Sequence, residues 1–435
     1  MTKNMIKAGD VQVLKVNLYS PYYNIPFDLS LVWQHISIFE DIKLNYIRGE
    51  ITIVDTQNLP ETIPIIGNER IQIEFKTPSE DSSAAVYVGQ VINVKSRLQV
   101  NQGSQLYVIE FISTEFVRNH QLKFSKAYQQ MLISDIVQDI YNQYLKPVSN
   151  KSISIVPTLN MESKVVPNFS PMKTINWLTK WARSPVYRSG ASYIFFENQY
   201  GYYFGPIESL IDPDVYKNPV ATYYRNIVHA QTDETKDINI GFYTVTDMKN
   251  NVANHLGNIK KGLYASSMQT HDIVRRTIEH SKLNYFDVFP EIQHLNNNKS
   301  KFDTQIFNDI GIGEYSDSYQ VLNPNHYAAF DDNIDSNRSD VTQLIRNSQL
   351  RQYDSIEMEI TIPGDSQRTI GEVIELRLPA IGLSSLEGNE DKYLSGNFLI
   401  LALRHDISRP DQSGRITHSS QMVVSKDTVK NPLSV

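Results

Sequence analysis

The stretch Glu50-Ile51-Thr52-Ile53 recurs as Glu359-Ile360-Thr361-Ile362, and this repeat decides the predicted fold. In both places a turn follows, and then two further apolar stretches that each contain a glycine. These stretches are residues 66–73 and 87–92 after the first copy, and residues 370–376 and 393–400 after the second. Alternating Ile and Val occur in all antiparallel sheets, but a shared order of three elements indicates one duplicated β-unit. A chance likeness between two β-domains is the alternative.

A duplicated unit favours assembly over catalysis. A closed ring of few chains presents twice as many similar units when each chain carries two of them. Several residues in or beside the repeated stretches are therefore expected to shape turns, strand starts and strand ends. They are Asp55, Gly67, Glu69, Gly89, Gly364, Gly371, Gly396 and His405.

The composition is that of a folded protein that does not bind phosphate. At 435 residues the chain is too long for one core and predicts two to four domains. Its net charge of −7 disfavours a nucleic-acid binder. The absence of cysteine excludes disulfides, thiolate metal sites and a cysteine nucleophile. The stretch Met1 to Val11 has no signal-peptide core and no apolar run approaches ~20 residues, so we expect synthesis and folding in a cytoplasm.

The pattern changes along the chain predict a mainly β protein with α+β insertions, in four segments. Residues 1–118 contain short alternating strands, typical of a small barrel or a sandwich. Residues 119–210 form an α+β insertion, and residues 211–350 form a connecting or insertion domain with long loops. Residues 351–435 return to the β-pattern and end in a tail, and strands from 220–246 could complete this last β-domain.

The α+β insertion has the clearest local signals. Ser134 can cap a helix over 135–145, and Ser170-Pro171 predicts a helix start before 172–182. A hairpin is expected over Asn198-Gln199-Tyr200-Gly201, since apolar stretches flank this turn.

No motif in the chain indicates catalysis, a cofactor or a metal. Asp331 to Asp335 resembles the start of a calcium loop, but Thr342 stands where that loop needs Glu. Gly311-Ile312-Gly313 lacks the third glycine of a dinucleotide site, and no His pair has zinc-peptidase spacing. His405 ends a strand, where a hydrogen bond explains it. We therefore expect a protein that is not an enzyme.

Several stretches, in order along most of the chain, resemble the central baseplate hub protein of contractile-tailed bacteriophages. This family comprises the trimeric hubs of T-even phages and their relatives, including the hub part of type VI secretion spike proteins. The stretches that carry the resemblance are residues 49–55, 64–69, 134–145, 177–178, 193–201, 262–265, 363–365, 371–372 and 394–400.

The resemblance implies a fold and a set of partners. Residues 1–118 and 351–435 would each form a tube-like antiparallel β-barrel, related by internal duplication. Three chains would close a homotrimeric, pseudo-sixfold ring that joins the hexameric tail tube to the trimeric central spike. Its partners would be the tube or tube-initiator protein, a separate spike protein and surrounding baseplate proteins, with DNA passing through without specific binding. The protein would reside in the virion tail baseplate, with no membrane contact, after assembly in the host bacterial cytoplasm.

Two other classes of function remain open. One is another virion or surface-binding β-protein, such as a tail-fibre or carbohydrate-binding module, which predicts repeats without the insertion. The other is a tail-borne cell-wall hydrolase, which needs a paired acid or metal constellation that the sequence does not contain. Duplicated β-units that flank an α+β insertion favour the hub.

Overall fold

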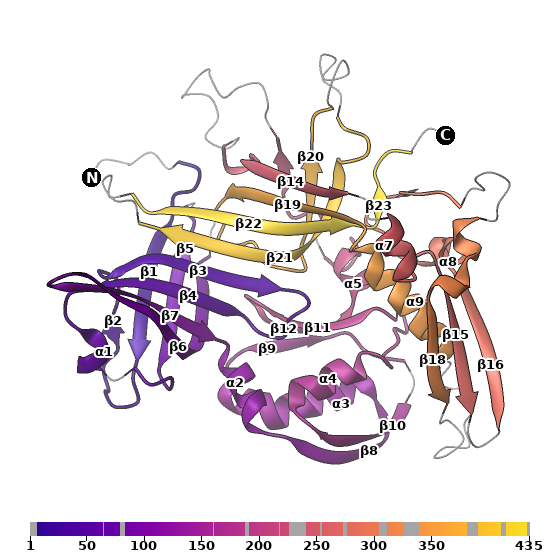
Figure 1. Ribbon diagram of the computed structural model, residues 1–435, viewed down its shortest axis with the longest axis horizontal. Coiled ribbons are helices and arrows are strands. Elements are labelled where there is room, and N and C mark those ends of the chain that lie inside the picture. Colours follow the sequence, from indigo (N-terminus) through magenta and orange to yellow (C-terminus); the bar gives the residue numbers. More distant parts are fainter. Residues whose placement is uncertain are drawn as a thin grey trace.

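A computed structural model describes most of the chain. It covers residues 7–63, 65–78, 83–159, 161–187, 191–216, 218–225, 241–252, 255–272, 276–303, 311–325, 339–380, 390–409 and 415–432. The chain is mainly β. One large sheet occupies the centre, the α+β insertion lies below it, and a smaller sheet with a helix stands at the right-hand end (Figure 1). No helix in the described ranges is long and apolar enough to cross a bilayer.

The first half of the large sheet is entirely antiparallel, with the order β3-β4-β7-β6-β5-β1-β2. Its elements are β1 (Gln12–Tyr19), β2 (Phe27–Asp28), β3 (Trp33–Asp41), β4 (Arg48–Asp55), α1 (Leu59–Thr62), β5 (Arg70–Lys76), β6 (Ala85–Asn101) and β7 (Ser104–Ile112). Strand β4 buries every second residue, Gly49, Ile51, Ile53 and Asp55, as the alternation in its sequence predicts. These side chains join a core that includes Trp33 and Tyr107.

The second half has the order β14-β19-β22-β21, and β20 and β13 continue from β21. Its strands are β13 (Thr222–Tyr224), β14 (Asp247–Val252), β19 (Ile356–Pro363), β20 (Val373–Arg377), β21 (Gly396–Ser408) and β22 (Thr417–Lys426). Strand β13 comes from the 220–246 stretch, of which residues 226–240 lie outside the described ranges. The pairing of β13 with β20 is parallel, and the other pairings are antiparallel.

The two halves form one sheet because β21 pairs with β3. The antiparallel register runs from Ala402 opposite Asp41 to Ser408 opposite His35. This joint corrects one expectation: in the described residues the large sheet is open, and neither half closes into a barrel. The physical reason is that β3, whose free edge a closed first barrel would need, has β21 as its neighbour instead of β1 or β2.

Strand order and chain order agree between the halves. The order β3-β4-β7-β6-β5-β1 of the first half matches β14-β19-β22-β21-β20-β13 of the second. The match in direction ends before the last strand, because β1 pairs antiparallel with β5 whereas β13 pairs parallel with β20. The match extends to register. Glu50 of β4 lies opposite Glu110, and Glu359 of β19 lies opposite Val423. In each case the partner residue lies beside an irregularity in the next strand, β6 or β21, so both Glu-Ile-Thr-Ile stretches occupy the same place in the sheet.

The irregularity is a β-bulge, and it occurs at equivalent positions. The β6–β7 register shifts between Val91 and Asn93, and the β21–β22 register shifts between Ile400 and Ala402. The backbone N–H of Val91 donates to the Glu69 carbonyl and that of Ile400 to the Glu372 carbonyl, both at 2.9 Å.

This register corrects the expectation that Gly89 and Gly396 occupy equivalent positions in the two repeats. Gly89 lies opposite Ile71, one step from the Arg70–Gln90 pair that starts its ladder. Gly396 lies opposite Leu376, at the far end of the β20–β21 ladder. Gly89 and Gly396 therefore do not occupy equivalent positions, although both lie in corresponding strands.

The α+β insertion packs its helices against two small sheets, β10-β8 and β11-β12-β9. Its elements are α2 (Thr114–Gln121), β8 (Phe124–Leu132), α3 (Ile133–Ile140), a π-helical turn (Tyr141–Leu145), a 3₁₀ turn (Lys146–Val148), β9 (Ser152–Ile155), β10 (Met161–Phe169), α4 (Pro171–Leu178), β11 (Tyr193–Asn198), β12 (Gly201–Pro206) and α5 (Ile207–Ile211). The expected hairpin is confirmed as β11 and β12. The second predicted helix is shorter than expected, because α4 ends at Leu178.

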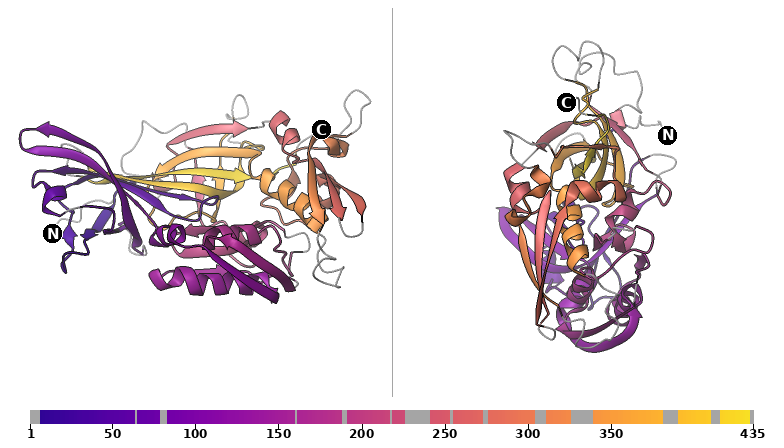
Figure 2. Two further views of the ribbon diagram at one scale, coloured as in Figure 1. Left: turned by 60° about the horizontal axis from the view of Figure 1, so that its bottom comes forward. Right: turned by 90° about the vertical axis from the view of Figure 1, so that its right-hand side faces the viewer.

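The end of the molecule opposite the β6–β7 hairpin holds a sheet of order β16-β15-β18 (Figure 2). Its elements and neighbours are α7 (His255–Lys260), β15 (Ala265–Asp272), β16 (Thr277–Asn284), α8 (Tyr285–Val288), 3₁₀ turns at Phe289–Glu291, Ile312–Glu314 and Ser316–Ser318, β17 (Asn298–Lys299), β18 (Gln320–Asn325), α9 (Ser339–Gln352) and β23 (Thr428–Val429). The sequence predicted mostly long loops here. The strands were missed because they are rich in Ser, Thr, Gln and His and lack an apolar alternation.

Candidate assembly interface

The described residues contain no group of three or more His, Asp or Glu side chains placed to hold a metal. The Asp331 to Asp335 stretch lies outside the described residues. The features that could carry function are therefore the outward face of the large sheet, its free strand edges, and the buried polar clusters that fix its shape.

Ion pairs lie on the outward face of the large sheet in both of its halves. Lys95 of β6 lies 3.4 Å from Glu50 and 2.5 Å from Glu110, and this contact lowers the pKa of Glu110. On the second half, Arg404 contacts Asp406 at 2.8 Å. Strands from both halves thus contribute oppositely charged neighbours to this face.

A shallow depression of about 250 Å³ lies on this face at the β3–β21 joint. The Arg48 and Arg404 guanidinium groups both lie over the Phe39 ring, at 4.7 and 5.2 Å from its centroid. Stacking of this kind stabilises cation and ring together. The joint between the halves is thereby reinforced by one residue from β3, one from β4 and one from β21.

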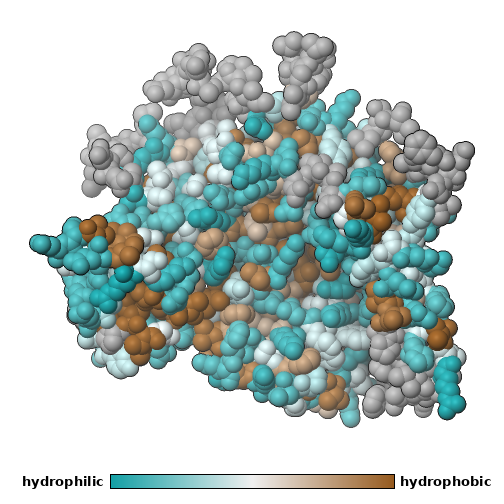
Figure 3. All heavy atoms as spheres, viewed as in Figure 1, coloured by the Kyte–Doolittle hydropathy of each residue, from teal (hydrophilic) through white to brown (hydrophobic). Residues whose placement is uncertain are grey.

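Two strand edges of the eight-strand run from β14 to β6 have no partner in the described part of the chain. One is the outer edge of β14. The other is the second half of β6, because β5 pairs only with residues 85–90 of that strand. Beyond this point Ile92, Leu98 and Val100 are all more than half exposed. The β6–β7 hairpin projects from the left-hand end of the molecule, where Figure 3 shows a group of hydrophobic side chains.

Asp55 and Glu69 hold the turns between β4 and β5. The Asp55 carboxylate accepts hydrogen bonds from the backbone N–H groups of Gln57 and Leu59, both at 2.7 Å. The Glu69 carboxylate accepts from Ile66, Gly67 and Asn68 at 2.9–3.1 Å. Both carboxylates are buried. They act on backbone donors that would otherwise be unsatisfied, which agrees with a structural role.

Three of the predicted glycines have backbone angles that favour glycine. The φ angles are +96° at Gly67, +83° at Gly371 and +135° at Gly396. Gly89 is required for another reason: a Cβ there would lie 2.6 Å from the Phe111 ring and 2.9 Å from the Ile112 carbonyl oxygen. Gly371 also packs against the insertion, since a Cβ there would lie 3.1 Å from Phe196.

Gly364 and His405 meet at a residue that the sequence analysis missed, His418. His405 Nδ1 and His418 Nε2 lie 3.0 Å apart, and both rings are buried. Phe75 contacts both rings edge-on. Burial lowers the pKa of His405 to about 4 and lowers that of His418 further below its ordinary range, so both are neutral at pH 7. This cluster joins a first-half strand, β5, to β21 and β22.

Two lysines with buried partners were also missed: Lys426, which is itself buried, and Lys151, whose side chain is 24% exposed. Lys151 lies 3.1 Å from Glu115 and contacts Glu197, which is fully buried and also accepts from the Tyr202 hydroxyl at 3.0 Å. Lys426 donates to the carbonyls of Tyr393 and Ser395, and burial lowers its pKa to about 7. No local pattern marks either lysine, because their partners are distant in sequence or are backbone atoms.

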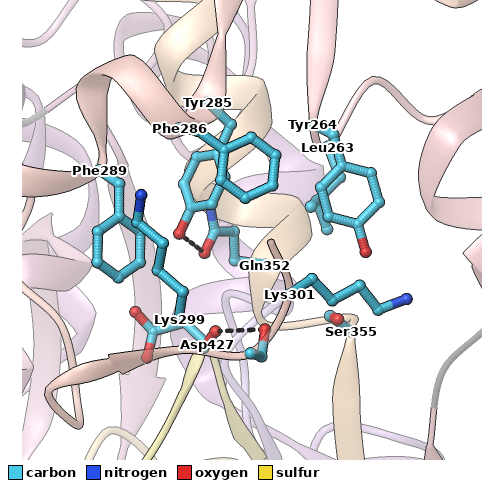
Figure 4. A pocket seen from close by; sticks show the side chains of 11 residues that line it. Leu263, Tyr264, Tyr285, Phe286, Phe289, Lys299, Lys301, Gln352, Ser355 and Asp427 are labelled. Carbon is cyan, nitrogen blue, oxygen red and sulfur yellow. Dashed lines mark hydrogen bonds between the residues drawn. The ribbon is translucent and has the colours of Figure 1, made fainter. Parts of the chain in front are cut away.

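Two cavities were considered as ligand sites. The one drawn in Figure 4 lies among Tyr264, Tyr285, Phe289 and Lys299 and has about 10 Å³ of free volume, the room of one water. Its Tyr285 hydroxyl donates to Gln352 at 2.5 Å. It is a packing junction between α8, β17 and the end of α9.

A larger recess of about 380 Å³ lies between β12 and the start of β20. It is rich in tyrosine, including Tyr200 and Tyr216, and its one acid, Glu372, is bonded to Arg368 at 3.1 Å. None of the unpartnered buried polar atoms in the described residues belongs to its lining. The recess is large enough for a small ligand, but its lining, among the described residues, contains no unpartnered buried polar group that would select one.

Comparison with known proteins gives a likeness in fold. No family model and no curated protein sequence matches the chain. The 43 kDa tail protein of prophage MuSo2 from Shewanella oneidensis superimposes with a TM-score of 0.55, covering 96% of this chain and 99% of that one at 9% identity. A tail protein from Neisseria meningitidis MC58 gives a TM-score of 0.53, covering 95% and 96% at 9% identity. The chain has the fold of phage tail proteins.

This likeness covers nearly the whole of all three chains, so it includes the insertion and the end sheet as well as the large sheet. It agrees with the resemblance to tail hubs that the sequence motifs indicated. At 9% identity the likeness lies in the backbone arrangement and not in particular side chains.

Proposed function

We propose that the protein is a structural baseplate hub of a contractile phage tail. Three chains would form a pseudo-sixfold ring that adapts the hexameric tail tube to the trimeric central spike, and the ring would be part of the DNA conduit. The observation that carries this proposal is the matched pair of strand sets within one chain, equal in order and in register. A duplicated tube-like unit resolves a mismatch between sixfold and threefold symmetry, because three chains supply six units.

The buried clusters support a structural role. The turn clamps of Asp55 and Glu69, the histidine pair and the lysine network all satisfy groups within the fold. Protein partners in this proposal are further copies of the chain, the tube or its initiator, the spike and neighbouring baseplate proteins, in the tail of a virion. We propose no enzymatic activity for it.

The test of the proposed function is the symmetry of the assembly. Native mass spectrometry of the purified protein should give three times the chain mass of 49.9 kDa. Class averages from electron microscopy should show a threefold ring with six similar lobes and a central opening. Assemblies of any other order, in the presence of a tail tube protein as well as alone, would contradict the hub.

The proposed role as a DNA conduit leads to a separate prediction. The outward face of the sheet, proposed as the channel wall, carries Lys95 and Arg404, and each of them contacts a carboxylate. Binding to DNA gains affinity from every phosphate that a free cation neutralises. We therefore expect the assembled protein not to retard duplex DNA in a gel at physiological salt. A retarded complex that persists at that salt would count against a conduit through which DNA must slide.

A further inference from the structure

The joint between β3 and β21 is a template for contacts between chains. The eight strands from β14 to β6 read as the same four-strand order twice: β14-β19-β22-β21, then β3-β4-β7-β6. The first set is joined to the second by β21 pairing with β3. The register makes β3 the equivalent of β14, and β6 the equivalent of β21. The series therefore ends at β6 with an edge equivalent to the one that β21 offers to β3.

The two open edges match the two sides of that joint. Strand β21 pairs with β20 through Leu399 and with β3 from Ala402 onward. Strand β6 pairs with β5 through Gln90 and has no further partner on that side among the described residues. Strand β14 likewise pairs only with β19 in the described ranges. An exposed strand edge with unpaired N–H and C=O groups is a template for another strand.

We infer that copies of this chain join by strand addition, with β14 of one chain pairing antiparallel with the second half of β6 in the next. The inference rests on the proposed function for the number of copies, and it adds the surfaces that meet. Such a contact is heterologous, because different surfaces of the two chains meet, and a contact of this kind closes into a ring when its rotation closes.

The internal β3–β21 joint also predicts the register of the β6–β14 contact between chains, at one place. Leu403 lies opposite Glu40 and Arg404 opposite Phe39 in the internal joint. The equivalent bulges align Leu403 and Arg404 of β21 with Val94 and Lys95 of β6. The equivalent ladders align Glu40 and Phe39 of β3 with Val252 and Asn251 of β14. The predicted contact therefore places Val94 opposite Val252 and Lys95 opposite Asn251 of the next chain. Beyond Lys95 the β6–β7 ladder has a further bulge that β21 lacks. The register is therefore committed only at Val94 and Lys95.

The Lys95–Asn251 pair suits a disulfide. The backbone N–H of Ile42 donates to the Leu401 carbonyl, and hydrogen-bonded pairs alternate along an antiparallel ladder. The Phe39–Arg404 pair lies three steps further along the ladder and is thus a pair without mutual hydrogen bonds. In such pairs the Cα atoms are about 4.5 Å apart, within the range that a disulfide spans. The chain has no cysteine, so an engineered pair has no competitor.

The experiment uses the full chain with Lys95→Cys and Asn251→Cys, oxidised by copper phenanthroline and separated without reductant. We expect covalent dimers and trimers, with most of the protein crosslinked. The matched control is Lys95→Cys with Asn250→Cys, which moves one cysteine by one residue to the other face of the strand. We expect at least tenfold less crosslinking in the control.

The outcomes separate this inference from the proposed function. A threefold ring by mass and microscopy that gives no crosslink at 95 and 251 overturns strand addition and leaves the hub standing. Crosslinked ladders that continue past the trimer support the contact and contradict the threefold hub. Equal crosslinking in the matched control would show random collision and would overturn the register.

Discussion

Lys151→Met is expected to lower the free energy of unfolding by about 3–5 kcal/mol, because it leaves buried carboxylates without their cation. The Glu197 side chain is fully buried, that of Glu115 is 3% exposed, and Lys151 contacts both. These residues come from β11, α2 and the segment before β9, so the loss falls on the α+β insertion. Urea denaturation of the variant and the parent measures the difference.

The same variant should be more sensitive to alkaline pH. Burial raises the pKa of Glu197, and the Lys151 charge opposes that rise. A carboxyl with a raised folded pKa favours folding at low pH and loses that contribution as pH rises through the folded value. Without Lys151 the pKa of Glu197 rises further, so the destabilisation at pH 8 should exceed that at pH 5.

A compensated variant provides the control. Lys151→Met combined with Glu115→Gln and Glu197→Gln contains no buried charge at this place, and it should recover most of the lost stability. A single variant as stable as the parent, or a triple variant less stable than the single one, would mean that the ion network does not hold the insertion together.

Gly364→Ala is expected to lower the free energy of unfolding by about 3 kcal/mol, at the upper end of the usual cost of overpacking. The added Cβ would lie 1.9 Å from the His418 ring. That ring cannot move away freely, because His405 lies 3.0 Å from it and Phe75 contacts it edge-on. The backbone is also fixed, since the Gly364 N–H donates to the His418 carbonyl at 2.9 Å.

The control for this substitution is Gly103→Ala, since a Cβ at Gly103 meets nothing closer than 4.0 Å. It should change the melting temperature little. Adding His418→Ala to Gly364→Ala should cost less than the sum of the two single changes, because the smaller side chain makes room for the Cβ. Additive losses would show that Gly364 and His418 do not share one packing site.

The sequence predicted those parts of the fold that local patterns determine. The Glu-Ile-Thr-Ile stretches lie on buried strands, since alternation places Ile51 and Ile53 on one face. Ser170-Pro171 starts a helix as expected. The joint between the halves could not be predicted, because it pairs residues 35–41 with 402–408. Nothing in either stretch indicates whether β3 closes on its own half or on the other.

The sequence singled out residues whose role is local, such as Asp55 and Glu69, whose carboxylates accept hydrogen bonds from their own turns. Gly67, Gly371 and Gly396 were found because glycine is required at their φ angles. His405 was noted, but its partner His418 lies in a strand whose other polar residues concealed it. No local pattern marks Lys151, Glu115 and Glu197, because only the tertiary fold brings them together and buries the two carboxylates.

Because the two halves join through the pairing of β21 with β3, the effect of a load on this joint would depend on the direction of the load. Force applied along β21 would place the β3–β21 joint in shear, so that all its pairs from Ala402–Asp41 to Ser408–His35 would have to yield together. Force applied across the strands would instead peel the pairs apart one at a time. A β-sheet joined in this way resists force along its strands more strongly than force across them. Its mechanical resistance would therefore depend on how the strands are tilted relative to the applied force.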